Sequence, residues 1–323
     1  MKFEIVINPN GASGAVKEAW KKVMPLFKDH TYSLHESTLT HGIEEICKEL
    51  TSHLKEDLNL VVIGGDGTLN AAINGIQDFK HTRLGFIPCG SGNDFARDLD
   101  LPKAHQEIVA RILEGKVRRA HDVGEIIFHT EMDVFDPMRK KIDKNEYARD
   151  YVRRFVNGAG IGFDAEICYY VETSRIKKGL NKIHLGKLVY IFEALHGILN
   201  AKRYVVRVDY ESGTKEYTEC LFVDGMNHRY QGGGFMFAPK ADPTDQKIDL
   251  CIADHVKNID FYRIFPYAYK GNHVKFDGVY EERDTQVRVH CAEPMWVQTD
   301  GEVHSKTTDA TIRIAKDALQ LLV

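Results

Sequence analysis

The sequence predicts an α/β domain followed by a β-rich domain, and three observations support this fold class. The chain has 323 residues, which is more than one compact core usually holds. Up to about residue 120, short apolar runs alternate with segments of helical periodicity, as in a parallel sheet covered by helices. From about residue 121, strand-like runs follow one another between Gly and Asp turns, which is typical of a largely antiparallel sandwich.

The first domain, residues 1–120, is expected to alternate strands with helices. The expected strands are the β-branched or apolar runs FEIVIN (3–8), TYSLHES (31–37), LNLVVI (58–63) and RLGFIP (83–88). The expected helices are the amphipathic runs VKEAWKKVMPLF (16–27), IEEICKELTSHL (43–54), TLNAAINGI (68–76) and EIVARILEG (107–115). This alternation predicts a parallel sheet with covering helices.

The second domain, residues 121–304, reads as a β-sandwich. The expected strands are DVGEIIFH (122–129), ARDYVRRFVNGAG (148–160), RYVVRVDY (203–210), EYTECLFVDG (216–225), KIDLCIAD (247–254), TQVRVHC (285–291) and MWVQTDGE (295–302). One strong helical pattern, NKIHLGKLVYIFEALHGIL (181–199), interrupts them.

Composition excludes several classes of protein. The formal net charge is −4, and because duplex-binding proteins are usually basic, we expect no nucleic-acid partner. No run approaches the roughly 18 apolar residues of a membrane span, and the start MKFEIVINPN lacks the features of a signal peptide. The six cysteines form no CxxC pair, so we expect a reduced, cytoplasmic chain without a disulfide framework or cysteine metal site.

The stretch GGDGT, residues 64–68, places three glycines around one carboxylate at the end of an expected strand. Glycines there allow backbone N–H groups to approach phosphate oxygens, and the following helix adds its positive N-terminal end. Asp66 would then hold a magnesium-bound water rather than the phosphate. A tight strand–helix turn without a ligand is the alternative for this motif taken alone.

Two further glycine-rich loops, NPNGASG (8–14) and the loop within IPCGSGNDFARDL (87–99), follow the first and fourth expected strands. Loops at the carboxyl ends of parallel strands meet at one crevice, so the three loops together predict a polyphosphate site. The Walker pattern GxxxxGK[ST] is absent from the sequence. GAGIG (158–162) resembles a dinucleotide fingerprint, but Phe163 stands where the third glycine belongs, and we interpret it as a structural turn.

In this order the loops resemble those of the bacterial soluble diacylglycerol kinase and lipid kinase family, whose catalytic domain is shared with sphingosine and ceramide kinases. The resemblance extends over essentially the whole chain. It is carried by Asn8-Pro9 with Gly14, Thr38 in TLTHG, GGDGTLN (64–70), PCGSGNDFAR (88–97), Asp122 in DVG, FVNGAGIGFDAEI (155–167), APKADPTDQKIDL (238–250) and QTDGE (298–302).

This resemblance implies an N-terminal α/β nucleotide-binding domain of the NAD kinase and diacylglycerol kinase type and a C-terminal β-sandwich domain. It also implies that residues 305–323 return to complete the first domain. The implied activity is ATP-dependent phosphorylation of a lipid hydroxyl, most typically diacylglycerol to phosphatidic acid. Such a reaction needs backbone donors, Mg²⁺ and a group that accepts the hydroxyl proton.

The family's binding residues carry over to matched positions. The positions expected to contact ATP are Asn8, Pro9, Gly14, Thr38, Gly64, Gly65, Asp66, Gly67, Thr68, Asn70 and Ser91. Asp66, Asp94 and Asp122 match carboxylates of the family's Mg²⁺–water network, and carboxylates suit this hard cation.

Asp300 and Glu302 match the family's catalytic acids. On a regular strand, residues two apart share one face, although Gly301 loosens that expectation. One acid would accept the proton of the lipid hydroxyl while the other orients it or binds metal, and the resemblance favours Glu302 as the acceptor. Taken alone, DGE is more often a turn with solvated carboxylates.

A second, structural Mg²⁺ site would use the Asp245 side chain with the carbonyls of Asp242 and Lys247. Here Gln246 stands where the family usually has glycine. If the turn needs positive φ, Gln246 strains it. A plain surface turn is the alternative.

Peripheral membrane contact is expected from the surface of the protein. The basic stretch RKKIDKNEYARDYVRR (139–154) could meet anionic headgroups, or be a solvated hairpin. The apolar stripe of the expected helix at 182–199 is interpreted as packing over an acyl-chain cleft. An exposed sandwich edge could also pair in a homodimer.

Two other functions compete with a lipid kinase. An NAD kinase also uses GGDGT, but GSGNDFAR and the late DGE favour the lipid-kinase arrangement. A non-catalytic nucleotide-binding regulator would have no need of the acidic residues Asp66, Asp94, Asp300 and Glu302. The sequence does not decide which lipid is the acceptor, and phosphatidylglycerol, ceramide or another lipid alcohol stays open beside diacylglycerol.

Overall fold

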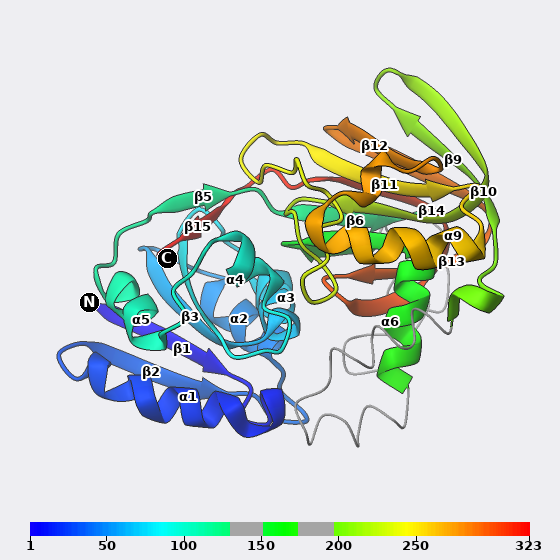
Figure 1. Ribbon diagram of the computed structural model, residues 1–323. Coiled ribbons are helices and arrows are strands. Elements are labelled where there is room, and N and C mark those ends of the chain that lie inside the picture. Colours follow the sequence, from blue (N-terminus) through cyan, green and yellow to red (C-terminus); the bar gives the residue numbers. More distant parts are fainter. Residues whose placement is uncertain (130–150, 174–196) are drawn as a thin grey trace. The chain divides into compact units, whose positions relative to one another are not determined.

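The computed structural model describes residues 1–129, 151–173 and 197–323, which form two compact units (Figure 1). The first unit comprises Met1–Val123 and Lys316–Val323, and the second comprises Gly124–Ala315. The basic residues 139–150 and most of the helix expected at 182–199 lie outside the described residues.

The first unit is built on a six-stranded sheet in the order β2-β1-β3-β4-β15-β5. Its strands are β1 (Lys2–Ile7), β2 (Thr31–Glu36), β3 (Leu58–Gly64), β4 (Thr82–Pro88), β5 (Arg119–His121) and β15 (Leu319–Leu321). β1 to β4 are parallel, β15 joins β4 in parallel, and only β5 is antiparallel to its neighbour within this described sheet. The predicted parallel sheet is confirmed.

Helices cover this sheet, and the longer ones present apolar residues at helical spacing. They are η1 (Gly11–Gly14), α1 (Ala15–Val23), η2 (Met24–Phe27), α2 (Ile43–Thr51), α3 (Asp66–Gly75), α4 (Asp94–Asp98) and α5 (His105–Leu113). In α1 the buried residues are Val16, Ala19, Trp20 and Val23, a spacing of i, i+3, i+4 and i+7. α1 packs against α5, and α2 against α3. A Cβ on Gly75 would lie 2.3 Å from the Glu44 carbonyl oxygen, so only glycine permits this crossing of α2 and α3.

The second unit is β-rich, with an antiparallel sheet of nine strands among the described residues. These are β6 (Gly124–Phe128), β7 (Tyr151–Phe155), β8 (Gly158–Gly162), β9 (Tyr204–Tyr210), β10 (Gly213–Met226), β11 (Ile248–Asp254), β12 (Val279–Asp284), β13 (Gln286–Thr299) and β14 (Glu302–Ile314). The order is β12-β11-β10-β8-β13-β14-β6-β7, and β9 pairs with β10 and β13 beyond the end of β8.

The sheet of the second unit encloses its own core. A Cβ on Gly225 of β10 would lie 2.9 Å from a methyl of Ile312 on β14 and 3.1 Å from one of Ile248 on β11. β10 and β14 are not neighbours in the strand order, so these side chains meet across the core, as in the predicted sandwich.

A second apolar cluster lies where helices cover β10 and β11. It joins α6 (Phe163–Thr173), α9 (Asn258–Ile264) and η6 (Phe265–Lys270) to the sheet through residues such as Phe222, Phe235 and Phe261. The short helices η5 (Ile198–Asn200) and η7 (His273–Lys275) adjoin them. Among the described helices, none has the length and hydropathy needed to cross a membrane.

Two expectations about the second unit need correction. GAGIG (158–162) is not a turn but the fully buried strand β8, which is hydrogen-bonded between β10 and β13. Residues 305–314 do not return to the first unit, because β14 continues through them and pairs with β13 and β6. The returning segment begins at Lys316.

Candidate active site

Four loops of the first unit leave its sheet at the same edge. The register pairs Ile7 with Glu36 and with Ile63, and Gly64 with Pro88. Because these strands are parallel, the segments that follow them emerge side by side. The predicted ATP-contacting residues lie at the ends of these strands or after them: Asn8, Pro9 and Gly14 follow β1, Thr38 follows β2, Gly64 ends β3 and is followed by Gly65, Asp66, Gly67, Thr68 and Asn70, and Ser91 follows β4.

The loops after β3 and β4 touch through their backbones. A Cβ on Gly90 would lie 2.8 Å from the Gly65 Cα, and a Cβ on Gly64 would lie 2.5 Å from the Thr68 side chain. The Cys89 N–H donates to the Gly64 carbonyl at 2.7 Å. Side chains are therefore excluded where the N-terminus of α3 begins, which leaves backbone N–H groups as the available donors for an anion.

The loops after β1 and β2 are ordered by their own side chains. Asn8 Oδ1 accepts a hydrogen bond from the Asn10 N–H at 3.1 Å, and Gly14 has φ of 94°. Thr38 Oγ1 accepts the His41 N–H at 3.1 Å, and Thr38 is exposed. Both loops thus have fixed backbones at the edge where a phosphate would bind.

Asn70 differs from the other predicted ATP residues. It is 2% exposed, and its Oδ1 accepts from the Asn74 amide at 3.2 Å within α3. Asn70 is therefore packed within α3, and its contact with ATP stays a prediction.

Asp66 and Asp94 are adjacent. The Asp94 N–H donates to Asp66 Oδ2 at 3.3 Å, and Asp94 forms an ion pair with Arg97, whose guanidinium also donates to the Gly92 carbonyl. Within the described residues, no three His, Cys, Asp or Glu side chains form a group that could hold a metal directly. Any cation here would be bound through water, as Mg²⁺ often is.

Asp122 does not share this edge by register. It is buried and directly follows β5, whose last residue, His121, pairs with Leu319 of β15. The residue after Leu319 in β15, Gln320, pairs with Arg83. Asp122 therefore lies near the beginning of β4 and not near its end. Asp66 and Asp94 follow the ends of β3 and β4 instead. The part of Asp122 in a magnesium network therefore stays a prediction.

In the second unit, Asp300 and Glu302 lie in the tight turn between β13 and β14 and have different environments. Asp300 has φ of 50° and is 9% exposed. Its carboxylate accepts the N–H groups of Val156 at 2.9 Å, Asn157 at 2.7 Å and Gly158 at 3.2 Å. Glu302 is exposed and pairs with Thr299 across the turn. Asp300 therefore anchors the turn to the segment between β7 and β8, and Glu302 is the acid that projects from it.

Sequence reasoning missed the residues that connect this turn to the rest of the unit. The Gln298 amide accepts the Gly301 N–H at 2.6 Å and donates to Asp164 Oδ2 at 2.6 Å. His304 is fully buried, and its ring nitrogen lies 2.6 Å from Thr299 Oγ1. Burial, with Arg153 nearby, lowers the pKa of His304 well below its usual value. Gln298 and Asp164 both fall inside stretches matched to the family, QTDGE and FVNGAGIGFDAEI. For Gln298, the available signal was a polar residue on an otherwise apolar strand; Asp164 lies at the start of α6.

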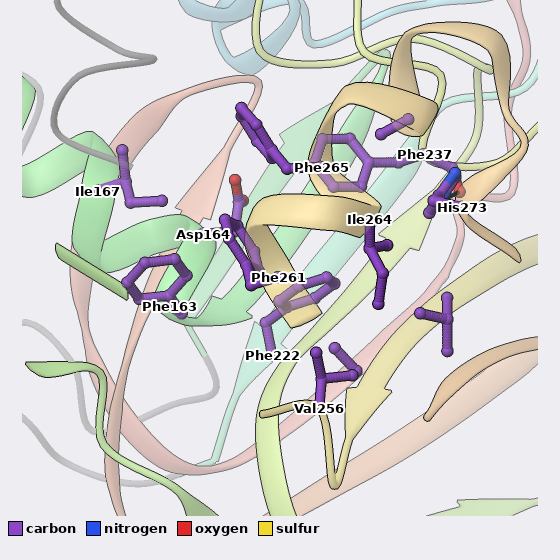
Figure 2. A pocket seen from close by; sticks show the side chains of 13 residues that line it. Phe163, Asp164, Ile167, Phe222, Phe237, Val256, Phe261, Ile264, Phe265 and His273 are labelled. Atoms are coloured by element: carbon purple, nitrogen blue, oxygen red, sulfur yellow. Dashed lines mark hydrogen bonds between the residues drawn. The ribbon is translucent and has the colours of Figure 1, made fainter. Parts of the chain in front are cut away.

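An apolar pocket lies between the sheet of the second unit and its helices (Figure 2). Its walls are aromatic and aliphatic side chains of β10, β11, α6, α9 and η6, among them Phe222, Phe261 and Phe265. Asp164 and His273 are its polar lining residues. Burial lowers the pKa of His273, so its ring is neutral at neutral pH, and Asp164 is the acidic group in the wall.

In the turn from Asp242 to Lys247, where a structural Mg²⁺ site was predicted, the guanidinium of Arg283 lies next to the Asp245 carboxylate. Gln246 has φ of 58°, so this position does take the left-handed conformation that usually favours glycine. Asp245 accepts the Lys247 N–H at 3.0 Å and lies 3.2 Å from the Arg283 guanidinium, which also lies 2.8 Å from Asp249. The residues do not fit a magnesium site, because Arg283 already neutralises the Asp245 carboxylate.

Comparison with known proteins gives matches along nearly the whole chain. The family model described as diacylglycerol kinase catalytic domain matches residues 2–126, and that described as YegS C-terminal NAD kinase beta sandwich-like domain matches residues 159–323. A diacylglycerol kinase of Bacillus subtilis (strain 168) is 26% identical over 304 residues, covering 93% of this chain and 89% of that protein. A diacylglycerol kinase of Staphylococcus carnosus (strain TM300) is 28% identical over 306 residues, covering 93% of this chain and 88% of that protein.

The fold has a counterpart among solved structures. The crystal structure of a diacylglycerol kinase from Bacillus anthracis str. Sterne superposes with a TM-score of 0.66 at 20% identity, covering 99% of this chain and 96% of that one. This likeness supports the arrangement of an α/β unit and a β-rich unit in one chain.

Proposed function

This chain belongs to the bacterial diacylglycerol kinase and lipid kinase family and is a lipid kinase. From that premise we propose that it transfers the terminal phosphoryl group of ATP to a lipid hydroxyl. The proposed reaction converts diacylglycerol to phosphatidic acid. One observation carries the choice of a lipid acceptor. The unit that holds the TDGE turn also contains an apolar pocket, and a single side chain, Gln298, contacts both the turn and the pocket residue Asp164.

The first unit supplies the ATP-binding groups. The glycine backbone of residues 64–68 and 90–92, together with the loops at Asn8 and Thr38, would receive the phosphates at the N-terminal end of α3. Backbone N–H groups suit this role because they are fixed donors that need no reorganisation when charge moves during phosphoryl transfer.

Magnesium fits the oxygen donors of the first unit only through water. Asp66 and Asp94 would bind Mg²⁺-coordinated waters, and Arg97, paired with Asp94, limits the local negative charge. When bound, the metal would neutralise charge on the phosphates. Asp122 is proposed for the same network from the family resemblance alone.

Glu302 is proposed as the group that accepts the proton of the lipid hydroxyl. Its side chain is exposed, whereas the Asp300 carboxylate is occupied by three backbone N–H donors. Asp300 would act by holding the turn so that Glu302 has a fixed position.

The apolar pocket would receive part of the lipid chain. Its volume is about 50 Å³, far below the roughly 300 Å³ or more of a drug-sized site. A long acyl chain would therefore have to displace side chains of α9 and η6 as it enters. Access to a lipid in a bilayer also requires contact with the membrane surface, and we propose peripheral association of a cytoplasmic protein; pairing of two copies stays a prediction.

The test is a kinase assay with labelled ATP and dioctanoylglycerol in mixed micelles, with NAD as the competing acceptor and the product identified by mass spectrometry. We expect label in the lipid as phosphatidic acid. Label in NAD and none in any lipid would contradict the proposal. Tight ATP binding with no phosphorylated product would instead support the non-catalytic regulator.

A substitution inside the pocket tests where the lipid binds. Ala268 lines the pocket and is 3% exposed, so Ala268→Phe should fill it and raise the KM for dioctanoylglycerol about tenfold while leaving the KM for ATP unchanged. Ala110→Phe, on the exposed side of α5, is the matched control. Thermal denaturation of both variants would show whether either one perturbs the fold, because adding bulk to a packed site can cost about 1–3 kcal/mol.

A further inference from the structure

The segment from Asn258 to Lys270 in the second unit is a continuous helical element, α9 followed by η6, with two different faces. Its inner face lines the apolar pocket through Phe261, Ile264, Phe265 and Ala268. Figure 2 shows the first three of these among the side chains of the pocket wall. Its outer face is turned to solvent, where a surface helix usually carries polar side chains.

The outer face of this segment exposes large apolar side chains. Ile259 is 68% exposed and Tyr267 is 51% exposed. Leu199 of η5, which is 60% exposed, lies beside the start of α9, because its carbonyl accepts the side-chain amide of Asn258 at 3.2 Å. Apolar side chains that are exposed near one another mark a surface that contacts a partner or a lipid.

The same segment is locally basic in an acidic protein. Residues 257–275 contain four Lys or Arg and one acidic residue, a net charge of +3 (4 minus 1) with His counted as neutral, whereas the whole chain has a net charge of −4. Its cations, all exposed, are Lys257, Arg263, Lys270 and Lys275. The acid, Asp260, lies 3.5 Å from Arg263, and because an exposed pair of this kind contributes little, Arg263 can exchange that contact for a phosphate.

From this arrangement we propose that the outer face of α9 and η6, together with Leu199, is the surface by which the protein contacts a lipid bilayer with anionic headgroups. This inference rests on the proposed lipid kinase function and assigns its membrane contact to named residues. Leu199, Ile259 and Tyr267 would enter the boundary between headgroups and acyl chains. Arg263 and Lys270 would meet the phosphates of the headgroups.

The position of the segment favours a bilayer over a protein partner. Its inner face lines the pocket proposed for the lipid chain, so a lipid that leaves a bilayer on the outer face would reach the pocket by passing side chains of α9 and η6, without crossing water. Tyrosine suits the boundary between membrane and water because its ring is apolar and its hydroxyl is polar. Each cation near an anionic bilayer strengthens binding about fivefold.

The experiment measures sedimentation of the purified protein with vesicles of phosphatidylcholine alone, or of phosphatidylcholine and phosphatidylglycerol in equal amounts, in the absence of ATP. We expect binding to be about tenfold or more stronger with phosphatidylglycerol present, and to weaken at high salt. Ile259→Ser combined with Arg263→Gln should lower binding to these vesicles about tenfold or more, since it removes an inserted aliphatic side chain and a cation. The thermal midpoint should not change, because both side chains are exposed.

Val205→Ser combined with Arg207→Gln is the matched control and should keep the binding of the unmodified protein. Both residues lie on β9, and Val205 is 44% exposed. Arg207 lies 3.4 Å from Asp209, much as Arg263 lies near Asp260. The control therefore makes the same kinds of change at another exposed site.

Equal binding of the unmodified protein to both kinds of vesicle, or binding to neither, would overturn the inference. Unchanged binding of the folded Ile259→Ser, Arg263→Gln variant would do the same. Sedimentation velocity without lipid tests a different occupant, since a dimer that this variant loses would assign the face to a second copy of the chain and overturn the proposal. Because vesicle binding needs no catalysis, these outcomes are separate from the acceptor assay, whose failure would reject the proposed function instead.

Discussion

At the scale of single residues, the two acids of the TDGE turn illustrate how environment separates similar side chains. Asp300 and Glu302 are two positions apart, yet one accepts three backbone N–H groups and the other is exposed. A carboxylate whose lone pairs are occupied in this way holds structure together. Glu302, the exposed acid of the two, is the one for which we propose contact with the substrate.

The first prediction separates these roles by substitution. Glu302→Gln should lower kcat by about 10²–10⁴-fold, the usual contribution of a general base, and leave the thermal midpoint unchanged. Asp300→Asn should lower both, because one oxygen that accepts N–H groups becomes an amide donor, at a cost of about 1–3 kcal/mol. Steady-state kinase rates and thermal denaturation are the measurements. A stable but inactive Asp300→Asn protein together with an active Glu302→Gln protein would reverse the assignment.

The second prediction concerns the pH dependence of stability through Asp224. Its pKa is raised by burial and by Asp164, and the neighbouring Cys251 stays neutral because burial raises the pKa of its thiol. Between the unfolded pKa of about 3.9 and the higher folded value, the folded state binds the additional proton, so stability falls as pH rises through that window. Asp224→Asn removes this titration.

We therefore expect Asp224→Asn to be more stable than the unmodified protein at pH 7 to 8, with the difference shrinking as the pH approaches 4. Urea unfolding across this pH range measures it. A difference that does not vary with pH would show that Asp224 is not a protonated buried acid.

At the scale of elements, the turn from Asp242 to Lys247 shows how one side chain can take the place of a cation. Arg283 on β12 reaches Asp245 in the turn and Asp249 on β11. The guanidinium also donates to the Lys240 carbonyl at 2.7 Å. It therefore ties three neighbouring segments together without a metal.

The third prediction follows from this arrangement. Arg283→Ala should lower the free energy of unfolding by about 1–3 kcal/mol, since it leaves the largely buried Asp249 without its charged partner. Lys240→Ala, which removes a nearby exposed pair with Glu281 at 2.7 Å, is the control and should cost less than about 1 kcal/mol. Adding Mg²⁺ in the absence of nucleotide should not stabilise the unmodified protein. A magnesium-dependent rise in its thermal midpoint that Asp245→Asn abolishes would restore the metal site.

The strand–loop–helix elements of the first unit were predictable because their signals are local. Apolar periodicity marks β3 and α3, and the glycines between them mark a backbone that must pass close to its neighbours. The prediction of a turn at GAGIG (158–162) was wrong because it also relied on a local signal. Its glycines suggested a turn, but they are needed in β8 because a side chain at Gly160 would collide with Asp164, Asp224 and Gln298.

At the scale of the whole molecule, the chain leaves the first unit at Val123 and re-enters it at Lys316. The returning segment places β15 between β4 and β5. Leu319, Leu321, Leu322 and Val323 are at most 1% exposed, so the last residues are part of the core of the first unit.

The fourth prediction tests that dependence. Deleting residues 316–323 should prevent the first unit from folding, because four buried apolar side chains at about 1.5–3 kcal/mol each approach the whole stability of a typical domain, about 5–15 kcal/mol. Gln320→Ala, which removes only an exposed hydrogen bond to the Lys80 carbonyl, should change stability by less than about 1 kcal/mol. Solubility, circular dichroism and ATP binding are the measurements. A truncated chain that still binds ATP would contradict the prediction.

The sequence by itself determined the succession of α/β and β-rich units and the glycine loops at the strand ends, because periodicity and the absence of a Cβ are properties of neighbouring residues. Only the tertiary structure decided that Asp300 anchors while Glu302 projects, that Arg283 neutralises Asp245, and that Asp164 and Asp224 meet at Gly160. These outcomes depend on contacts such as Asp300 with Val156, 144 positions apart, and Gln298 with Asp164, 134 positions apart. Strand register sets such contacts, and local patterns do not specify register between distant segments.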